Sequence, residues 1–166
     1  MTARDEIYAY LGALGIEYTH TAHAPVRSID DCKWAQQRLH GLMPKNLLLT
    51  PRNTSAYTLL IAHPRAIFRT SDISKQLGSA RLSFAGEPAL EQYLHTSPGA
   101  LSPMGLIFES ANGVRFAVDE ALRDEPALLF HPNDNRETLA MSGPDFFERF
   151  LPGVGHEPTF VTLGNA

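Results

Sequence analysis

The segment Ser97–Gly105 constrains the fold of this chain more than any other stretch, because prolines and glycines punctuate it. Proline fixes φ and lacks an N–H donor, whereas glycine accepts a positive φ. Such a run continues neither a helix nor a central strand, so it predicts a loop with a fixed backbone shape. Fixed backbone dipoles can bind a polar ligand or stabilise charge that develops in a transition state. An ordinary connecting loop is the commoner meaning of the same composition.

Length and composition predict one globular domain. The 166 residues are enough for a proper core, 43% of them are hydrophobic, and no apolar run approaches the length of a membrane span. The N-terminus leads directly into an amphipathic pattern without a visible signal peptide, and the single Cys32 excludes an internal disulfide. We therefore expect a cytoplasmic protein.

The charge balance bears on nucleic-acid binding. Fourteen Lys and Arg against eighteen Asp and Glu give a net charge of −4. This balance argues against binding of duplex DNA through a basic face. Recognition of a single nucleotide end needs only a few local cations and stays open.

Helical and extended patterns are mixed along the chain. This mixture predicts a single α+β or α/β domain with a mixed, mostly antiparallel sheet surrounded by helices. Capping-box spacing marks helix starts at Thr2 and Ser28, and Thr70 or Ser71 can cap a third helix. The expected helices are residues 2–14, 28–39, 70–77, 87–94 and 144–151, and the expected strands are 17–21, 44–49, 56–62, 81–84, 106–109, 114–118, 128–131 and 137–141.

Two local signals shape the second half of the chain. Asn112-Gly113 between apolar runs predicts a β-hairpin. Pro152 is expected to stop the last helix. The sequence thus divides into a domain at residues 1–151 and a C-terminal tail at residues 152–166, which shows no periodicity and is expected to lie on the surface or to be disordered.

Three side chains could take part in chemistry. Lys45 and Asn46 stand at the start of an apolar strand, where an ammonium suits a phosphate or a carbonyl oxygen and an amide both donates and accepts. A surface lysine beside a strand is the commoner reading. His131 precedes a proline at the end of another apolar strand, so it could orient a substrate group or simply be a hydrogen-bonded loop histidine.

Familiar catalytic motifs are absent from the sequence. There is no G-x-S-x-G elbow, P-loop, G-x-G-x-x-G or H-E-x-x-H. His20 and His23 lack a third metal ligand at a sensible spacing, Cys32 reads as a packed small residue, and Ser97 and Ser102 have no neighbouring base. We expect no metal and no cofactor, and we expect catalysis to depend on positioned backbone and substrate groups.

Five motifs in order resemble a known family. They are Lys45–Leu49, Leu77–Phe84, Ser97–Leu106, Val118–Glu120 and Phe130–Asn135. Together they resemble the superfamily of YbaK and the prolyl-tRNA synthetase insertion domain, which contains trans-editing aminoacyl-tRNA deacylases. The sequence of these motifs is most similar to that of the free-standing ProXp-ala group, which hydrolyses alanine mischarged on proline tRNA.

The resemblance implies the fold and the roles of the site residues. Lys45 would contact the terminal adenosine phosphate or the ester carbonyl, and Asn46 would bind substrate. The segment Gly99, Ala100, Leu101, Ser102 and Pro103 would place backbone groups around the ester and a water, with Met104 and Gly105 beside them. His131 would shape and limit the side-chain pocket. The substrate's own ribose hydroxyl and an ordered water would do the hydrolysis, without metal or covalent intermediate.

The same resemblance implies a tRNA substrate and leaves the amino acid and the activity with alternatives. The substrate would be the aminoacylated acceptor end of proline tRNA, with prolyl-tRNA synthetase open as a partner and no membrane involved. Arg69-Thr70-Ser71 replaces the usual Asp-Leu-Lys, and Asp134 brings an acidic group near the pocket, so the amino acid and the tRNA stay open. The alternatives are a deacylase for cysteine, serine or a non-protein amino acid, and an inactive module that binds tRNA or a synthetase.

Overall fold

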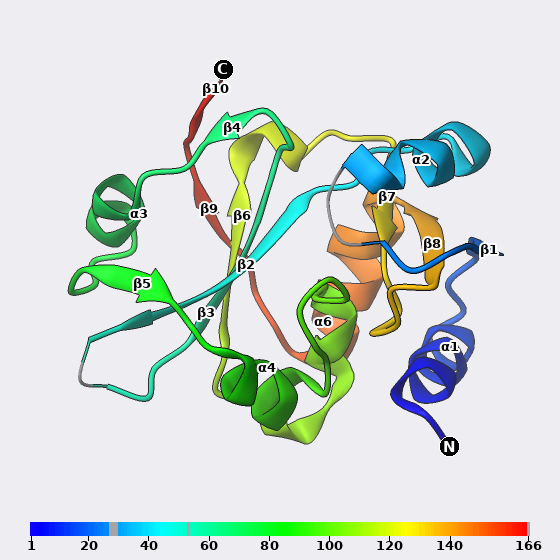
Figure 1. Ribbon diagram of the computed structural model, residues 1–166, viewed down its shortest axis with the longest axis horizontal. Helices are drawn as coiled ribbons and strands as arrows, with labels where there is room; N and C mark the ends of the chain where they lie inside the picture. The colour runs from blue at the N-terminus through cyan, green and yellow to red at the C-terminus, as the bar shows by residue number, and fades with distance from the viewer. Residues whose placement is uncertain (27–29, 53, 166) are drawn as a thin grey trace.

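A five-stranded mixed sheet forms the centre of the computed structural model, which describes residues 1–26, 30–52 and 54–165 (Figure 1). Its strands, in order across the sheet, are β5 (Leu82–Phe84), β2 (Lys45–Pro51), β3 (Thr58–Ala62), β6 (Arg115–Asp119) and β9 (Thr159–Val161). Strand β2 is antiparallel to its neighbours β5 and β3, whereas β6 is parallel to β3 and to β9.

A three-stranded antiparallel sheet packs beside the large one. Its order is β1 (Thr19–Ala22), β8 (Glu137–Ser142) and β7 (Ala127–Phe130). Leu42 joins the two sheets just before β2, because its N–H donates to the Ala127 carbonyl at 3.0 Å and its carbonyl accepts from Leu129 N at 2.9 Å. A two-stranded ribbon of β4 (Ala66–Ile67) and β10 (Gly164–Asn165) completes the strands of the described residues.

Helices cover both faces of the large sheet. The helical segments are α1 (Ala3–Ala13), η1 (Asp30–Cys32), α2 (Lys33–Leu39), α3 (Thr70–Gln76), α4 (Glu87–Leu94), η2 (Pro103–Ile107), η3 (Glu109–Ala111), η4 (Glu120–Leu122), α5 (Gly143–Asp145), η5 (Phe146–Phe150) and α6 (Leu151–Val154). Helix α3 lies against one face, and α1, α4 and the last helical segments gather on the other side together with the small sheet (Figure 1).

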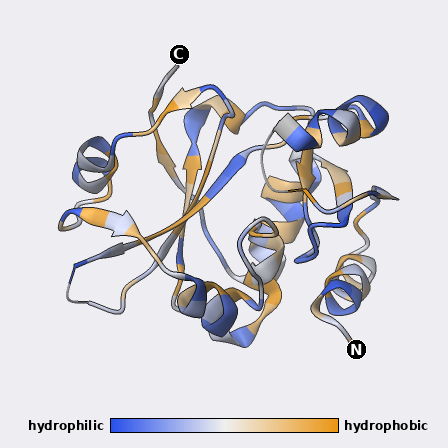
Figure 2. Cartoon of the chain, in the orientation of Figure 1, coloured by the Kyte–Doolittle hydropathy of each residue, from blue (hydrophilic) through white to orange (hydrophobic). Residues whose placement is uncertain are grey.

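Alternation along the strands of the large sheet divides their apolar residues between two cores, one on each face. Leu48 faces the larger core, where helix α4 and the segment η2 pack against the sheet, and Leu49 faces the smaller core with α3. Figure 2 shows hydrophobic colouring along the inner strands and more polar colouring on the outer helices. This division decides which β2 side chains can meet the Gly/Pro loop.

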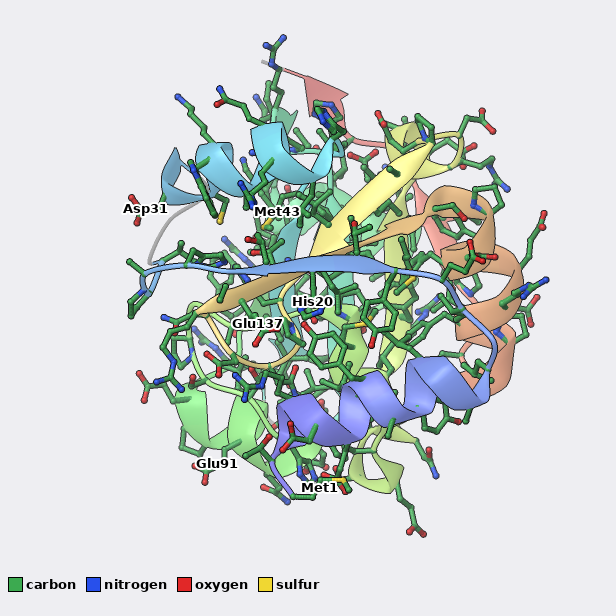
Figure 3. All side chains as sticks on the ribbon, turned by 90° about the vertical axis from the view of Figure 1, so that its right-hand side faces the viewer. Met1, His20, Asp31, Met43, Glu91 and Glu137 are labelled. Carbon is green, nitrogen blue, oxygen red and sulfur yellow. The ribbon has the colours of Figure 1, made fainter. Side chains whose placement is uncertain are left out.

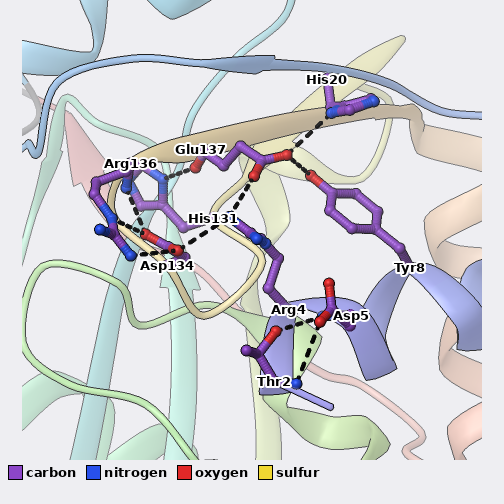
Figure 4. Close-up of polar contacts among 9 residues, drawn as sticks. All are labelled: Thr2, Arg4, Asp5, Tyr8, His20, His131, Asp134, Arg136 and Glu137. Carbon is purple, nitrogen blue, oxygen red and sulfur yellow. Dashed lines mark hydrogen bonds and ion pairs between the residues drawn. The ribbon is translucent and has the colours of Figure 1, made fainter.

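Helix α1 is tied to the small sheet by polar contacts. Thr2 and Asp5 form the predicted capping box, and Ile7 and Leu11 are fully buried. The Glu137 carboxylate, at the start of β8, accepts hydrogen bonds from other elements (Figure 4). Its contacts are Tyr8 Oη at 2.7 Å, Arg4 at 3.0 Å and His20 Nδ1 at 3.0 Å.

The contacts of this carboxylate fix the small sheet against α1. Figure 3 shows His20 and Glu137 between the β1 ribbon and α1. Burial and the hydrogen bond to Glu137 raise the pKa of Tyr8 above its ordinary range. Tyr8 therefore stays a neutral donor to the carboxylate at ordinary pH.

The structure confirms a single α+β fold with mixed sheets. Helix α4 has the predicted bounds, and β7 and β8 pair antiparallel as two consecutive strands. The predicted start of the second helix at Ser28 lies outside the described residues. Helix α3 is present, but the predicted caps are wrong, because Thr70 is already helical and its N-cap Arg69 makes no side-chain capping bond.

The predicted hairpin around Asn112-Gly113 is wrong. The apolar run before this turn forms the short 3-10 helices η2 and η3, and β6 pairs in parallel with β3 instead. Leu106 is only 1% exposed inside η2, so burial of its side chain is satisfied without a strand. Tertiary packing here overrides a local turn signal.

Pro152 does not stop the last helix. The helix takes a π-helical turn over η5, in which Leu151 N donates to the Phe146 carbonyl five residues back. A π turn changes the spacing of hydrogen bonds just before proline, so the helix continues through α6. It ends at Gly155, whose φ is +75°.

The last residues of the chain belong to the sheets. The expectation of a loose or surface tail is wrong for residues 159–165, because β9 is an edge strand of the large sheet and β10 pairs with β4. Val161 is 1% exposed. The division at residue 151 into an editing domain and a tail stays a prediction.

Candidate active site

The Gly/Pro loop is held between α4 and the loop that joins β7 to β8. Gly99 has a φ of +87°, and a side chain there would place its Cβ 3.3 Å from the Val26 carbonyl oxygen. The same carbonyl accepts a hydrogen bond of 3.0 Å from Asn135 Nδ2, and Val26 N donates to the Asn135 carbonyl at 3.1 Å. Glycine is thus required here by both conformation and space.

Ser102 is a structural residue of the loop. Its side chain is fully buried, and its hydroxyl donates to the His131 carbonyl at 2.6 Å while accepting from Met104 N at 3.1 Å. Because this hydroxyl is buried and hydrogen-bonded to two main-chain groups, it is not an exposed nucleophile. The loop approaches α4 closely at Gly105, because this residue has no side chain. A Cβ there would lie 2.6 Å from the Leu94 carbonyl oxygen.

A cavity of about 360 Å³ opens beside this loop. Pro98, Gly99 and Leu101 line it from the loop, and Asn46 lines it from β2. Within the described part of the chain, the amide N–H groups of Gly99 and Leu101 have no hydrogen-bond acceptor, whereas Ala100 N donates to Ser97 O at 3.1 Å. Such N–H groups are the usual partners of a developing oxyanion.

Asn46 and Lys45 lie on opposite faces of β2. Asn46 lines the cavity, and its Nδ2 donates to the Pro44 carbonyl at 3.2 Å. Its Oδ1 is buried and, among the described residues, has no hydrogen-bond partner. The Lys45 ammonium instead donates to the Ala66 carbonyl at 3.4 Å, toward β4. The amide, rather than the ammonium, meets the loop.

His131 lies away from this cavity, in a second polar cluster. Its ring is buried, and Nδ1 donates to the Glu137 carbonyl at 2.8 Å, which leaves Nε2 facing the Cys32 sulfur at 3.9 Å. His23 Nε2 accepts from Thr138 Oγ1 at 2.7 Å, and the two imidazole rings are 6.1 Å apart. His131 supports the loop through its main-chain carbonyl, as the Ser102 bond shows.

Burial controls the protonation of this cluster. Burial lowers the pKa of His131, with the nearby His23 acting in the same direction and the Glu137 carbonyl opposing it. Burial also raises the pKa of the Cys32 thiol to about 11, reinforced by Asp31. Both groups are therefore neutral at physiological pH, and the thiol is not activated as a nucleophile.

The structure brings together only part of the predicted site. Asn46, Gly99 and Leu101 line one cavity, whereas Ala100, Ser102, Pro103, Met104 and Gly105 are buried behind it and hold the loop. Sequence reasoning missed several lining residues, among them Phe84 and Glu87. The Arg81–Phe84 motif was the available signal, but only the fold shows that it reaches the loop.

The described residues hold no group of three His, Cys, Asp or Glu side chains arranged to bind a metal ion. None of their helices combines the length and the apolar character needed to cross a bilayer.

Comparison with known proteins gives the family. The model of the aminoacyl-tRNA editing domain matches residues 23–148. The chain belongs to this family. It is 30% identical over 156 residues to the prolyl-tRNA editing protein ProX of Acetoanaerobium sticklandii, and the match covers 94% of each chain. It is 33% identical over 165 residues to the prolyl-tRNA synthetase associated domain-containing protein 1 of Mus musculus, with 96% of each chain covered.

The fold agrees with this assignment. A solved structure described as a candidate trans-editing enzyme for prolyl-tRNA synthetase superposes with a TM-score of 0.73 at 13% identity, over 100% of this chain and 99% of the other. As a member of the editing family the protein is an aminoacyl-tRNA deacylase, an ester hydrolase. The geometry fits a hydrolase that works through positioned backbone groups.

Proposed function

We propose that the protein hydrolyses alanine mischarged on proline tRNA. Two residues that line the cavity carry the proposal, Gly99 and Leu101, because their amide N–H groups have no acceptor among the described residues. The ester carbonyl oxygen accepts from them as the tetrahedral intermediate forms. A water adds to the carbonyl carbon, the ester C–O bond breaks, and the proton of the water passes to the ribose oxygen that leaves as a hydroxyl.

The cavity supplies contacts for the rest of the aminoacyl group. The unpartnered Oδ1 of Asn46 accepts from a donor of the substrate, and the Glu87 carboxylate attracts its α-ammonium group. Lys45 keeps the role that the family resemblance gives it, contact with the terminal adenosine phosphate or the ester carbonyl, and either contact requires its ammonium to leave the Ala66 carbonyl. The same proposal includes prolyl-tRNA synthetase as a partner of the protein and the cytoplasm as its location.

The editing logic explains why alanine is the proposed substrate. A synthetase pocket built for proline rejects a smaller side chain weakly, since each missing methylene contributes only about 1–3 kcal/mol of discrimination. A second enzyme that removes the smaller amino acid raises fidelity. The name of the ProX relative, a prolyl-tRNA editing protein, supports proline tRNA as the carrier.

A panel of mischarged tRNAs tests the proposal. Release of labelled amino acid is measured on proline tRNA charged with alanine, serine, cysteine or proline. Fastest turnover of the alanyl ester supports the proposal, and faster turnover of another ester replaces alanine with that amino acid. Binding of uncharged tRNA without hydrolysis of any ester would show an inactive module. Undiminished turnover by Lys45→Ala would remove Lys45 from the mechanism.

A further inference from the structure

A second cavity, of about 580 Å³, adjoins the candidate active site. Phe84 lines both cavities, so the two meet at its side chain. Residues from the end of β2, the start of α3 and strand β5 line the second cavity. These elements lie at the left of the view in Figure 1. We call it the arginine cleft, and its lining residues are Arg52, Thr70, Ala80, Arg81, Leu82, Ser83 and Phe84.

Two positive charges in the cleft lack an acidic partner. Arg52 and Arg81 are exposed, and neither forms an ion pair with another described residue. Four other arginines have carboxylate partners among the described residues: Arg4, Arg123, Arg136 and Arg149. A guanidinium fork matches the geometry of a phosphate, and hydroxyl groups of Thr70 and Ser83 lie in the same cleft.

Phe84 adds an exposed aromatic surface between the two cavities. It is 62% exposed, on the edge strand β5, with the ring of Phe68 at 5.6 Å supporting it. An exposed phenyl group beside arginines is the arrangement that binds single-stranded nucleic acid, because bases stack on the ring while cations contact the backbone.

We propose that the arginine cleft binds the unpaired 3′ strand of the tRNA acceptor end. Arg52 and Arg81 contact its phosphates, and a base next to the terminal adenosine stacks on Phe84. The inference rests on the proposed function, because the ester in the Asn46–Gly99 cavity places the preceding nucleotides at Phe84. Local charge thus compensates for the negative charge of the whole protein.

The test measures the salt dependence of RNA binding. Affinity for a fluorescein-labelled single strand ending in CCA, and for uncharged proline tRNA, is measured by anisotropy at several NaCl concentrations. Each single-strand phosphate contact contributes about −0.7 to the slope of log K against log salt. The double variant Arg52→Ala/Arg81→Ala is expected to bind more weakly with a slope shallower by about 1.4. Arg52→Lys/Arg81→Lys should keep most of the slope.

Matched variants separate this site from a general charge effect. Arg149→Ala also removes one positive charge, but on η5, which lies on the other side of the molecule from β5 (Figure 1). This variant should keep the wild-type slope of log K against log salt. Phe84→Ala should weaken binding about tenfold, from the loss of one stacked base, and leave the slope unchanged. A slope for the double variant equal to that of Arg149→Ala would overturn the inference.

A substrate without phosphodiesters separates this inference from the proposed function. The double variant should hydrolyse 3′-O-alanyl-adenosine at the wild-type rate while its KM for alanyl-tRNA rises. If the wild type hydrolysed no ester at all, the proposed function would fail, but the difference in slope would still support the RNA site. Equal urea midpoints for variants and wild type establish that all of them are folded.

Discussion

The hydroxyl of Ser102 donates to the main-chain carbonyl of His131 at 2.6 Å, and this bond joins the Gly/Pro loop to the loop after β7. The two residues are 29 positions apart in the chain, and both are buried. Neither residue lines the cavity at Gly99, and their hydrogen bond holds the loop in place.

Ser102→Ala is expected to destabilise the protein more than it impairs chemistry. The change leaves the His131 carbonyl and the Met104 amide without their partner, at a cost of about 1–3 kcal/mol in the free energy of unfolding. Urea denaturation measures this loss, and deacylation assays at saturating substrate measure kcat. A collapse of kcat with an unchanged urea midpoint would point to a side-chain mechanism instead.

Gly99→Val is expected to impair deacylation strongly. A β-branched residue resists the φ of +87°, and its Cβ would press on the Val26 carbonyl and on Asn135. A shift of the loop by about 1 Å lowers kcat/KM on the order of 10²-fold. Gly113→Ala is the control, because a Cβ at Gly113 meets nothing within 4 Å and should leave activity unchanged. Equal activity of both variants would separate the Gly99 conformation from catalysis.

Asn46→Ala tests the amide that meets the loop. The variant loses only the bond to the Pro44 carbonyl within the protein, so the free energy of unfolding should fall by about 1 kcal/mol or less. If Oδ1 accepts from the substrate, kcat/KM should fall by about tenfold or more. Leu49→Met, on β2 but outside the cavity lining, controls for changes in strand packing. An unaltered kcat/KM would remove Asn46 from substrate binding.

The stability of the protein should decline below pH 6.5 because of His131. Burial lowers the pKa of His131 below its ordinary value of 6.5, and Asp134 and the Glu137 carbonyl only partly oppose this. Between 6.5 and the lowered pKa the unfolded chain binds more protons, so stability falls as pH falls through that window and is constant above it. Burial lowers the pKa of His156 as well, which adds to the same slope.

Urea midpoints between about pH 5 and pH 8 measure this dependence, which spans the range where histidines titrate. His131→Asn should reduce the slope below pH 6.5, with the part due to His156 remaining. His40→Asn is the control, since His40 is exposed with a φ of +56°, a conformation that asparagine accepts. An identical slope in wild type and His131→Asn would contradict the prediction.

Local signals predicted the elements that local chemistry controls. The acidic residue and proline of the first turn placed helix α4, and the prolines and glycines of Ser97–Gly105 predicted a shaped loop. The face on which the loop docks depends on long-range packing, so the sequence could not separate Asn46 from Lys45. The same limit hid the lining role of Phe84 and made Asn112-Gly113 look like a hairpin.

Truncation after Leu151 is expected to destabilise the protein. It removes β9, the parallel partner of β6, and with it Val161, which is 1% exposed in the core beside α3. The lost burial of one such side chain alone costs about 1.5–3 kcal/mol. Phe160 is lost too, and the Arg123 guanidinium lies 3.7 Å from the centre of its ring.

Urea denaturation of the full chain, of residues 1–151 and of residues 1–165 measures the contribution of the last strands. The 1–165 protein is the control, because it keeps both β9 and β10. We expect a lower midpoint and weaker deacylation only for residues 1–151. A full midpoint with full activity for that fragment would show that the editing domain ends at residue 151 and that the last strands are dispensable. A lower urea midpoint for residues 1–151 would show that the folding unit includes the strands after residue 151. The edge strand β9 would then stabilise the sheet that carries Asn46.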